Sequence, residues 1–241
     1  MKKTTIDNTN INTLLVVNGV LTIPEGVTAI AEGAFEGRND IKEVRLPSSL
    51  RSIGERAFYG CTSLVEVSFP TGLTAIGAYA FAGCTALRSV LLPKGLTLID
   101  EGAFRGCTAL KEVVTPNGVD FIGEGAFEGC ETLEKVVLPE ELTDLEAGSF
   151  ARCKALKKVK LPEGLTTIGA YAFWSCTALR SVQLPEALTS IGRWAFEDCE
   201  ALEEFNIPMS VSSIGMGAFS GCASLALNSE GHPVQGAEAT R

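Results

Sequence analysis

The pattern of hydrophobic and polar positions repeats along the chain every 23 residues. With proline as position 0, each unit reads P-x-x-L-x-x-I-G-x-x-A-F-x-G-C-x-x-L-x-x-V-x-L, and phenylalanine occupies position +11 in all nine copies. No insertion or deletion interrupts the series of prolines, which are Pro24, Pro47, Pro70, Pro93, Pro116, Pro139, Pro162, Pro185 and Pro208. A constant period of this length predicts a solenoid in which each copy forms one coil.

Two periodicities inside each copy predict its local structure. Positions +17 to +22 end in alternation, as in Leu133, Val136 and Leu138, which predicts a short parallel strand. Proline then ends the strand because it has no N–H to donate. From +6 to +14 the apolar positions are spaced 4, 1 and 3 apart, which predicts a helical turn. One copy cannot bury this apolar set alone, so neighbouring copies must complete the core.

The two ends of the array depart from the repeat. Asn18-Gly19 lies between two apolar runs, and this dipeptide is a strong signal for a β-hairpin. We therefore expect an N-terminal cap with a hairpin at residues 1–23 and nine repeats at residues 24–228. The last segment, residues 229–241, is small and polar, and we expect it to be a disordered tail.

The strand pattern L-x-x-V-x-L-P and the turn pattern A-F-x-G-C resemble the BspA-type leucine-rich repeat family of bacterial and some protist surface proteins. The resemblance covers residues 24 to about 227. It implies an α/β repeat solenoid, a right-handed coil with a parallel concave sheet and with short strands and helical turns on its other faces. It also implies a secreted or cell-surface binding module for adhesion or for recognition of a protein or glycan. A host extracellular protein is one candidate partner.

Composition narrows the classes of function. The chain has 241 residues, 46% of them hydrophobic, and a net charge of −9, which argues against a nucleic-acid partner. No apolar run is long enough for a transmembrane helix, so we expect no membrane insertion. Asp7 and Asn8 interrupt the place where a signal peptide has its apolar region. We therefore expect the export signal to lie in sequence outside this chain, and a cytoplasmic location is the alternative.

All eight cysteines occupy position +14, at Cys61, Cys84, Cys107, Cys130, Cys153, Cys176, Cys199 and Cys222. Equivalent positions in stacked coils point in the same direction, whereas a disulfide needs side chains directed at each other. We predict buried free thiols that pack as small hydrophobes. The only histidine, His232, lies in the expected tail and no C-x-x-C occurs, so we expect no metal site. Without a histidine partner for a nucleophile, we predict no enzyme activity and no cofactor.

Inside each strand, positions +19 and +21 should face solvent because +17, +20 and +22 turn inward. Column +21 then carries three consecutive apolar residues, with charged residues beside them. The predicted ligand-binding residues on the concave face are Leu91, Glu112, Val114, Lys135, Val137, Lys158 and Lys160. An apolar centre with a charged margin is typical of an interface. The alternative is that Leu and Val are there because they favour strands.

A second candidate surface consists of aromatic residues on the turn side. Tyr171 and Trp194 occupy position +9 in adjacent copies, and Trp174 occupies +12. Tyr and Trp are favoured interface anchors, although these rings could instead fill gaps where other copies have glycine. The whole protein also has a rival interpretation, a structural spacer or intracellular scaffold with no ligand on its sheet. A binder should concentrate unusual residues in a few coils, whereas a spacer should not.

Overall fold

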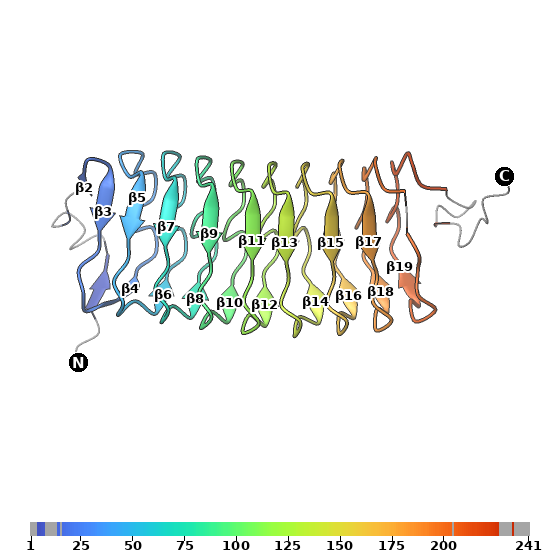
Figure 1. Cartoon of the computed structure of the whole chain (residues 1–241), viewed down its shortest axis with the longest axis horizontal. Helices are drawn as coiled ribbons and strands as arrows, with labels where there is room; N and C mark the ends of the chain where they lie inside the picture. The colour runs from blue at the N-terminus through green and yellow to red at the C-terminus, as the bar shows by residue number, and fades with distance from the viewer. Residues whose placement is uncertain (1–3, 8–13, 15, 204, 227–232, 234–241) are drawn as a thin grey trace.

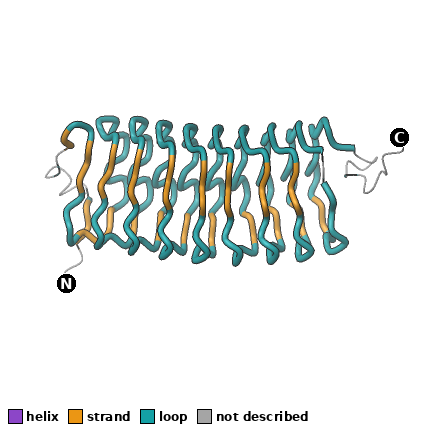
Figure 2. Tube along the Cα trace, viewed as in Figure 1, coloured by secondary structure: helices purple, strands orange, loops and turns teal. Residues whose placement is uncertain are grey.

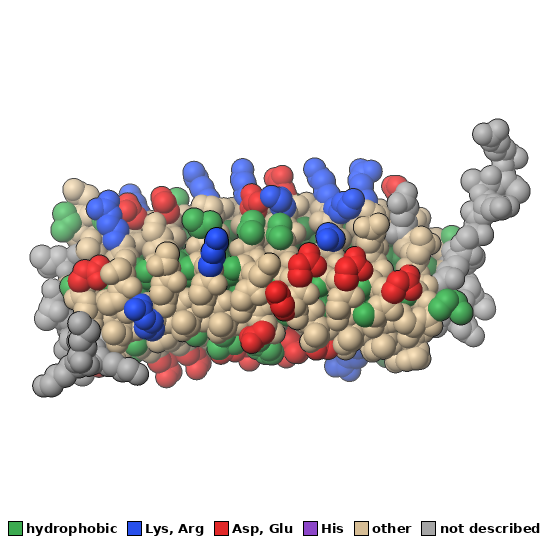
Figure 3. Space-filling model, turned by 60° about the horizontal axis from the view of Figure 1, so that its bottom comes forward, with side chains coloured by type: hydrophobic (Ala, Val, Ile, Leu, Met, Phe, Trp, Pro, Cys, Tyr) green, Lys and Arg blue, Asp and Glu red, His purple; other side chains and the backbone are tan. Residues whose placement is uncertain are grey.

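The computed structural model describes residues 4–7, 14, 16–203, 205–226 and 233 of the chain. Its coils, numbered here from the one that begins at Pro24, stack side by side into an elongated array (Figure 1). Coils 1 to 7 have three sides: a strand of three residues, a second strand that has two residues in all of them but the first, and a series of turns at positions +7 to +14, which we call the turn ridge. The array runs nearly straight (Figures 1 and 3). The sheet that was expected to be concave is therefore close to flat along the stack.

The longer strands form the side that we call the long-strand face. Its strands are β3 (Val20–Thr22), β5 (Glu43–Arg45), β7 (Glu66–Ser68), β9 (Ser89–Leu91), β11 (Glu112–Val114), β13 (Lys135–Val137), β15 (Lys158–Lys160) and β17 (Ser181–Gln183). Where these strands pair with one another, they pair in parallel. At the N-terminal edge, β2 (Val16–Val17) pairs antiparallel with β3 through a turn at Asn18 and Gly19, whose φ angles are 52° and 83°. Two successive positive φ angles are the geometry of a type I′ hairpin.

The shorter strands form a second parallel surface, the short-strand face. Its strands are β1 (Thr4–Ile6), β4 (Val27–Ile30), β6 (Ser52–Ile53), β8 (Ala75–Ile76), β10 (Leu98–Ile99), β12 (Phe121–Ile122), β14 (Asp144–Leu145), β16 (Thr167–Ile168), β18 (Ser190–Ile191) and β19 (Ser213–Ile214). β1 comes from the N-terminal segment and pairs with β4 of the first coil. The period-23 pattern does not predict this strand, because it precedes the first repeat.

The turn ridge corrects the prediction of helical turns, because the described residues contain no helix (Figure 2). The backbone N–H groups of the ridge alternate between two kinds of acceptor. The N–H of Phe104 donates to the carbonyl of Ala126 in the next coil at 2.8 Å, whereas the N–H of Arg105 donates to the carbonyl of Gly102 three residues back at 2.9 Å. Gly102 and Gly106 have positive φ angles of 55° and 69°. Left-handed residues at this spacing break an α-helix, so the ridge is a chain of β-turns hydrogen-bonded between coils.

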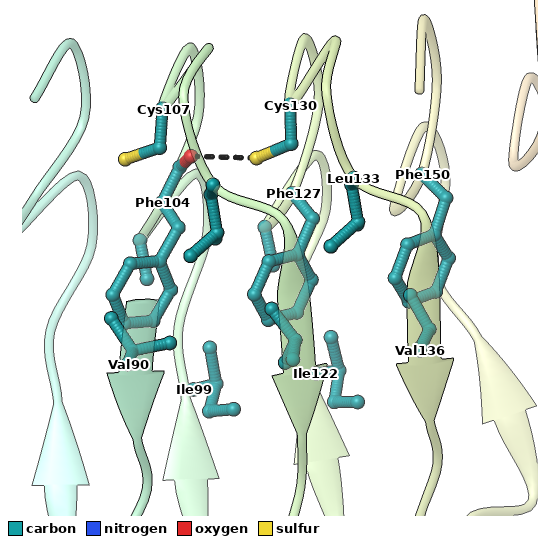
Figure 4. Packing of buried hydrophobic residues seen from close by; sticks show 14 of the residues in the cluster. Val90, Ile99, Phe104, Cys107, Ile122, Phe127, Cys130, Leu133, Val136 and Phe150 are labelled. Carbon is teal, nitrogen blue, oxygen red and sulfur yellow. Dashed lines mark hydrogen bonds between the residues drawn. The ribbon is translucent and has the colours of Figure 1, made fainter. Parts of the chain in front are cut away.

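A column of stacked phenylalanine rings fills the interior (Figure 4). The rings of Phe104 and Phe127 have centroids 5.6 Å apart and planes inclined by 2°, and both side chains are fully buried. The other neighbouring pairs along the column are stacked in the same way, with centroids 5.0 to 5.8 Å apart. Offset-stacked rings at this separation are a favourable aromatic geometry. One apolar core therefore runs along the array.

The eight cysteines are free and buried, as predicted. They are more than small hydrophobes, because each Sγ lies 3.1 to 3.4 Å from the carbonyl oxygen of a phenylalanine in the preceding coil. Figure 4 shows this bond between Cys130 and Phe104. Burial raises the pKa of the Cys61 thiol to about 11 and that of Cys130 to about 12. Only a protonated thiol can donate a hydrogen bond to the carbonyl. In the folded state the eight thiols, which we call the thiol ladder, are therefore uncharged.

Strand pairing is interrupted between coils 5 and 6 on both faces. β12 is not paired with β14, and β13 is not paired with β15, although neighbouring strands pair on either side. Position +7 is close to the preceding coil, since a Cβ on Gly123 would lie 2.5 Å from the backbone nitrogen of Glu101. Coil 6 has Glu146 at this position, so a side chain stands where most coils have glycine. Asp100 at the equivalent position keeps its N–H 3.0 Å from the Ile76 carbonyl, so a side chain here does not by itself interrupt pairing. The core continues across the interruption, since the Phe127 and Phe150 rings are 5.5 Å apart.

Candidate functional site

The structure brings the three predicted apolar residues together at the ends of β9, β11 and β13. Val114 pairs in register with Leu91 on one side and with Val137 on the other. Their exposed fractions are 81% for Leu91, 42% for Val114 and 40% for Val137. We call these residues the apolar strip. Figure 3 shows hydrophobic side chains in a row near the middle of the array, beside a margin of Lys and Arg side chains.

The predicted charged residues divide into two groups. Glu112 and Lys135 lie opposite each other on β11 and β13 and form an ion pair, so the charge of Lys135 is compensated at the strip. Lys158 and Lys160 lie on β15, beyond the interruption in the sheet. Lys160 is 3.6 Å from Glu140. The charged residues that were predicted to border the strip together therefore lie in two places. Glu112 and Lys135 form an ion pair at the strip, and Lys158 and Lys160 lie in the next coil.

Lys158 and Lys160 line a cavity of about 670 Å³ that lies over β15, β17 and residues 206–209. Ser181, Gln183 and Asn206 add hydroxyl and amide groups to this cavity. It has the volume of a small-molecule pocket, but its polar lining differs from the mainly apolar lining of such pockets. Columns +19 and +21 along coils 6 to 8 carry polar and charged residues, namely Lys158, Lys160, Ser181, Gln183, Glu204 and Asn206. These columns indicate a polar surface, but they do not reveal that it is hollowed.

A basic edge borders the long-strand face and was missed in the sequence, because only positions +19 and +21 were considered. It is formed by the exposed basic residues at +18, namely Lys42, Arg88, Lys111, Lys157 and Arg180. Glu134 and Glu203 are exposed at the same position, so the column as a whole has a net charge of about +3 from five basic and two acidic residues. Within the described part of the chain none of the five forms an ion pair. In a protein with a net charge of −9, this edge is a local positive field beside the apolar strip. It can attract carboxylate or phosphate groups.

The predicted aromatic residues also come together, on the turn ridge. The rings of Tyr171 and Trp194 stack with centroids 5.1 Å apart, and Trp174 meets Tyr171 edge to face at 6.2 Å. Trp194 covers Gly217, where a Cβ would lie 2.5 Å from the indole ring, so the gap-filling interpretation describes this residue well. Tyr171 and Trp174 instead line a cavity with two carboxylates from coil 5.

The described residues offer no group of three or more His, Cys, Asp or Glu side chains that could hold a metal ion. Nor does this part of the chain contain a helix of the length and apolar character needed to cross a bilayer. What the geometry offers is a set of surfaces: an apolar strip, a basic edge and two cavities. These surfaces can bind a partner through burial, ion pairs and hydrogen bonds.

Comparison with known proteins identifies similar repeats. The family model described as "BspA type Leucine rich repeat region (6 copies)" matches residues 17–134 and 99–226. No curated protein has significant similarity to the chain.

Among solved structures, a leucine-rich repeat protein from Bacteroides ovatus is 29% identical, with a TM-score of 0.69 over 87% of this chain and 74% of that one. The leucine-rich repeat protein of T. pallidum is 30% identical, with a TM-score of 0.59 over 87% and 78%. A leucine-rich cell surface protein from Faecalibacterium prausnitzii is 20% identical, with a TM-score of 0.53 over 88% and 91%. Neither the family description nor the names of these three proteins indicates a catalytic activity.

Proposed function

We propose that this repeat module, which belongs to the BspA-type leucine-rich repeat family, holds a protein partner against its long-strand face. The observation that carries the proposal is the apolar strip. Leu91, Val114 and Val137 are in register on adjacent strands and are 40% exposed or more. Strand propensity explains each residue singly. An interface explains why they are adjacent and why a charged margin follows them.

The partner that fits this surface is a protein segment with apolar side chains flanked by acidic ones. Apolar side chains would be buried on the strip, which gains free energy in proportion to the area removed from water. Acidic side chains would then face the basic edge, where Lys111 is the member in the same coil as Val114. Complementary charge of this kind speeds association and fixes orientation more than it adds affinity. A glycan fits the strip less well, because aliphatic side chains offer no partners to sugar hydroxyls.

A location at the cell surface is part of the same proposal, and adhesion is the role that it suggests. The protein from Faecalibacterium prausnitzii is named as a cell surface protein. At 20% identity this likeness concerns the fold, so the location needs its own measurement. Fractionation of the source cells with an antibody against the repeats should place the protein in the envelope or the medium. Recovery in the cytosol alone would favour the intracellular scaffold instead.

The binding proposal is tested by capturing extracellular-matrix and serum proteins on the immobilised chain. Val114→Asp/Val137→Asp places two charges on the strip and should abolish capture of any specific partner. The matched control is Leu98→Asp/Phe121→Asp, because these two residues also pair in register and lie on the short-strand face. Phe121 is 40% exposed, as Val137 is. Equal capture by both variants would contradict docking on the strip and would favour a spacer.

A further inference from the structure

The cavity beside Tyr171 and Trp174 has two chemically different walls. Glu124 and Glu128 of coil 5 form one wall, and the two aromatic rings of coil 7 form the other. Coil 6 supplies only small residues at the floor, which are Ala147, Gly148 and Ala151. The stacked phenylalanines give the size of the two coil steps between the walls as 5.5 and 5.8 Å. A trough one coil wide therefore separates a carboxylate wall from an aromatic wall.

The size of this cavity limits what it can hold. Its volume is about 240 Å³, below the roughly 300 Å³ at which ordinary ligand pockets begin. It is open to solvent along the turn ridge, since Glu124 is exposed and Tyr171 and Trp174 are partly exposed. A single functional group at the end of a longer chain fits it better than a whole metabolite.

The charge of the lining selects a cation. Two carboxylates face the space, and the faces of aromatic rings carry the negative part of the ring quadrupole. None of the eight lining residues, all within the described part of the chain, is basic. Arginines outside the lining already contact its walls: Arg105 forms an ion pair with Glu128 at 3.2 Å, and Arg152 and Arg193 make cation–π contacts with the Trp174 and Tyr171 rings at 6.0 and 5.8 Å. Glu124 forms no ion pair within the described residues, so the lining keeps negative character for a further cation.

The same ridge shows which cation suits these groups. Arg56 lies 4.1 Å from the centroid of the Tyr59 ring while it forms an ion pair with Glu36 at 2.6 Å. One guanidinium thus stacks on a ring and pairs with a carboxylate at once in coils 1 and 2. A planar guanidinium can do both because its N–H groups lie in the plane that stacks, whereas an ammonium group is a compact point charge. Carboxylates opposite aromatic rings therefore favour arginine over lysine.

The backbone of Tyr171 has the left-handed conformation that the turn ridge adopts at position +9. Its φ angle is 59°, in the left-handed region that bulky residues avoid. The two preceding coils have Gly125 and Gly148 at the equivalent position, with φ angles of 59° and 62°. A tyrosine here carries a conformational cost that glycine does not. Arg56, Tyr79 and Trp194 carry the same cost at the equivalent position of other coils, with φ angles of 52°, 53° and 52°, so the conformation belongs to the repeat.

We propose that this cavity binds an arginine side chain of a partner protein, with its guanidinium between the Glu124 and Glu128 carboxylates and the rings of Tyr171 and Trp174. The site lies on the turn ridge, away from the long-strand face, and does not depend on docking at the apolar strip. It gives the module a second point of contact, on another side of the coils. Two such contacts on one partner would raise its overall affinity through effective concentration.

The test uses tryptophan fluorescence, because the chain has only two tryptophans. The variant Trp194→Phe retains an aromatic ring against Tyr171 and leaves Trp174, in the cavity wall, as the sole reporter. This protein is titrated with N-acetylarginine amide, with N-acetyllysine amide, and with N-acetylcitrulline amide, which has a similar shape and no charge. We expect saturable change with the arginine compound at a dissociation constant on the order of millimolar, since one side chain makes the contact.

The comparisons decide between arginine and other occupants. We expect the citrulline and lysine compounds to bind at least about tenfold more weakly, and Glu124→Gln/Glu128→Gln in the same background to weaken arginine binding at least about tenfold. The control is Glu134→Gln/Glu141→Gln, which makes the same change in net charge at two exposed residues outside the cavity and should bind as before. Absence of saturation, equal binding of citrulline or lysine, or unchanged binding after the Glu124 and Glu128 changes would each overturn the proposal.

Discussion

Raising the pH should unfold the protein through its ladder of buried thiols. In the unfolded chain each cysteine titrates with a pKa near 9.0, whereas burial raises the pKa of Cys61 to about 11 and those of Cys130, Cys176 and Cys222 to about 12. The other four are also raised by burial. Because the folded pKa is raised, this contribution to stability is complete below pH 9 and is lost as the pH rises toward the folded values.

The size of the effect follows from the number of thiols. At pH 9 each unfolded thiol is half ionised, which lowers the free energy of unfolding by about 0.4 kcal/mol, and at pH 10 by about 1.4 kcal/mol. Eight thiols therefore remove roughly 3 kcal/mol at pH 9 and roughly 11 kcal/mol at pH 10. The second figure is comparable to the whole stability of an ordinary domain, about 5 to 15 kcal/mol. We expect the array to be folded at pH 8 and unfolded near pH 10.

Urea denaturation followed by circular dichroism at a series of pH values measures this loss. Since lysine and tyrosine also titrate at alkaline pH, the control is the variant Cys130→Ala/Cys153→Ala, which removes two of the eight thiols. Its total stability is lower at pH 7, but its loss of stability from pH 7 to pH 9 should be smaller than that of the parent by about 0.8 kcal/mol, because two thiols at about 0.4 kcal/mol each are absent and the lysines and tyrosines are common to both proteins. A parent stability that does not change between pH 7 and pH 9, or an equal loss in parent and variant, would refute the role of the ladder.

Further predictions concern packing, the cap and the break in the sheets. Phe127→Ala removes one fully buried ring from the column and should lower the free energy of unfolding by about 3 to 5 kcal/mol in urea denaturation; a loss under 1 kcal/mol would contradict a continuous core. Gly19→Ala introduces a Cβ at a φ of 83° and 3.1 Å from the Lys42 side chain, and should cost about 1 to 2 kcal/mol by the same assay. Strands β12 to β15 should exchange amide hydrogens faster than β6 to β9, because their pairing is interrupted; uniform protection would argue against the break.

Much of the fold could be predicted from the repeat itself. The prolines and the phenylalanine column give the number of coils, their register and the residues of the core, because every apolar position recurs at the same place. The turn ridge could not be assigned by apolar spacing alone, since successive β-turns place Ala103, Phe104 and Cys107 inward at the same intervals as one face of a helix. A signal against the helix was present in Gly102 and Gly106, four residues apart, where positive φ angles end an α conformation.

For the candidate site, the sequence predicts only which strand residues face solvent, because that follows from the alternation of side chains along a strand. Alternation placed Val114 and Val137 on the exposed side because side chains in a strand point to opposite faces in turn. It could not reveal the ion pair between Glu112 and Lys135, which depends on side-chain conformation across two strands. Nor could it locate the interruption of strand pairing between coils 5 and 6, because the hydrophobic pattern is the same on both sides of it.

The claim that a partner docks on the apolar strip is tested most directly by photo-crosslinking from within it. A benzophenone amino acid is introduced at Val114, and in a second protein at Phe121 on the short-strand face; the two residues have similar exposed fractions of 42% and 40%. Each protein is irradiated with the extracellular protein that the parent captures. We predict a covalent adduct from position 114 and none from position 121. Adduct formation from position 121 alone, or from both positions equally, would contradict docking on the long-strand face.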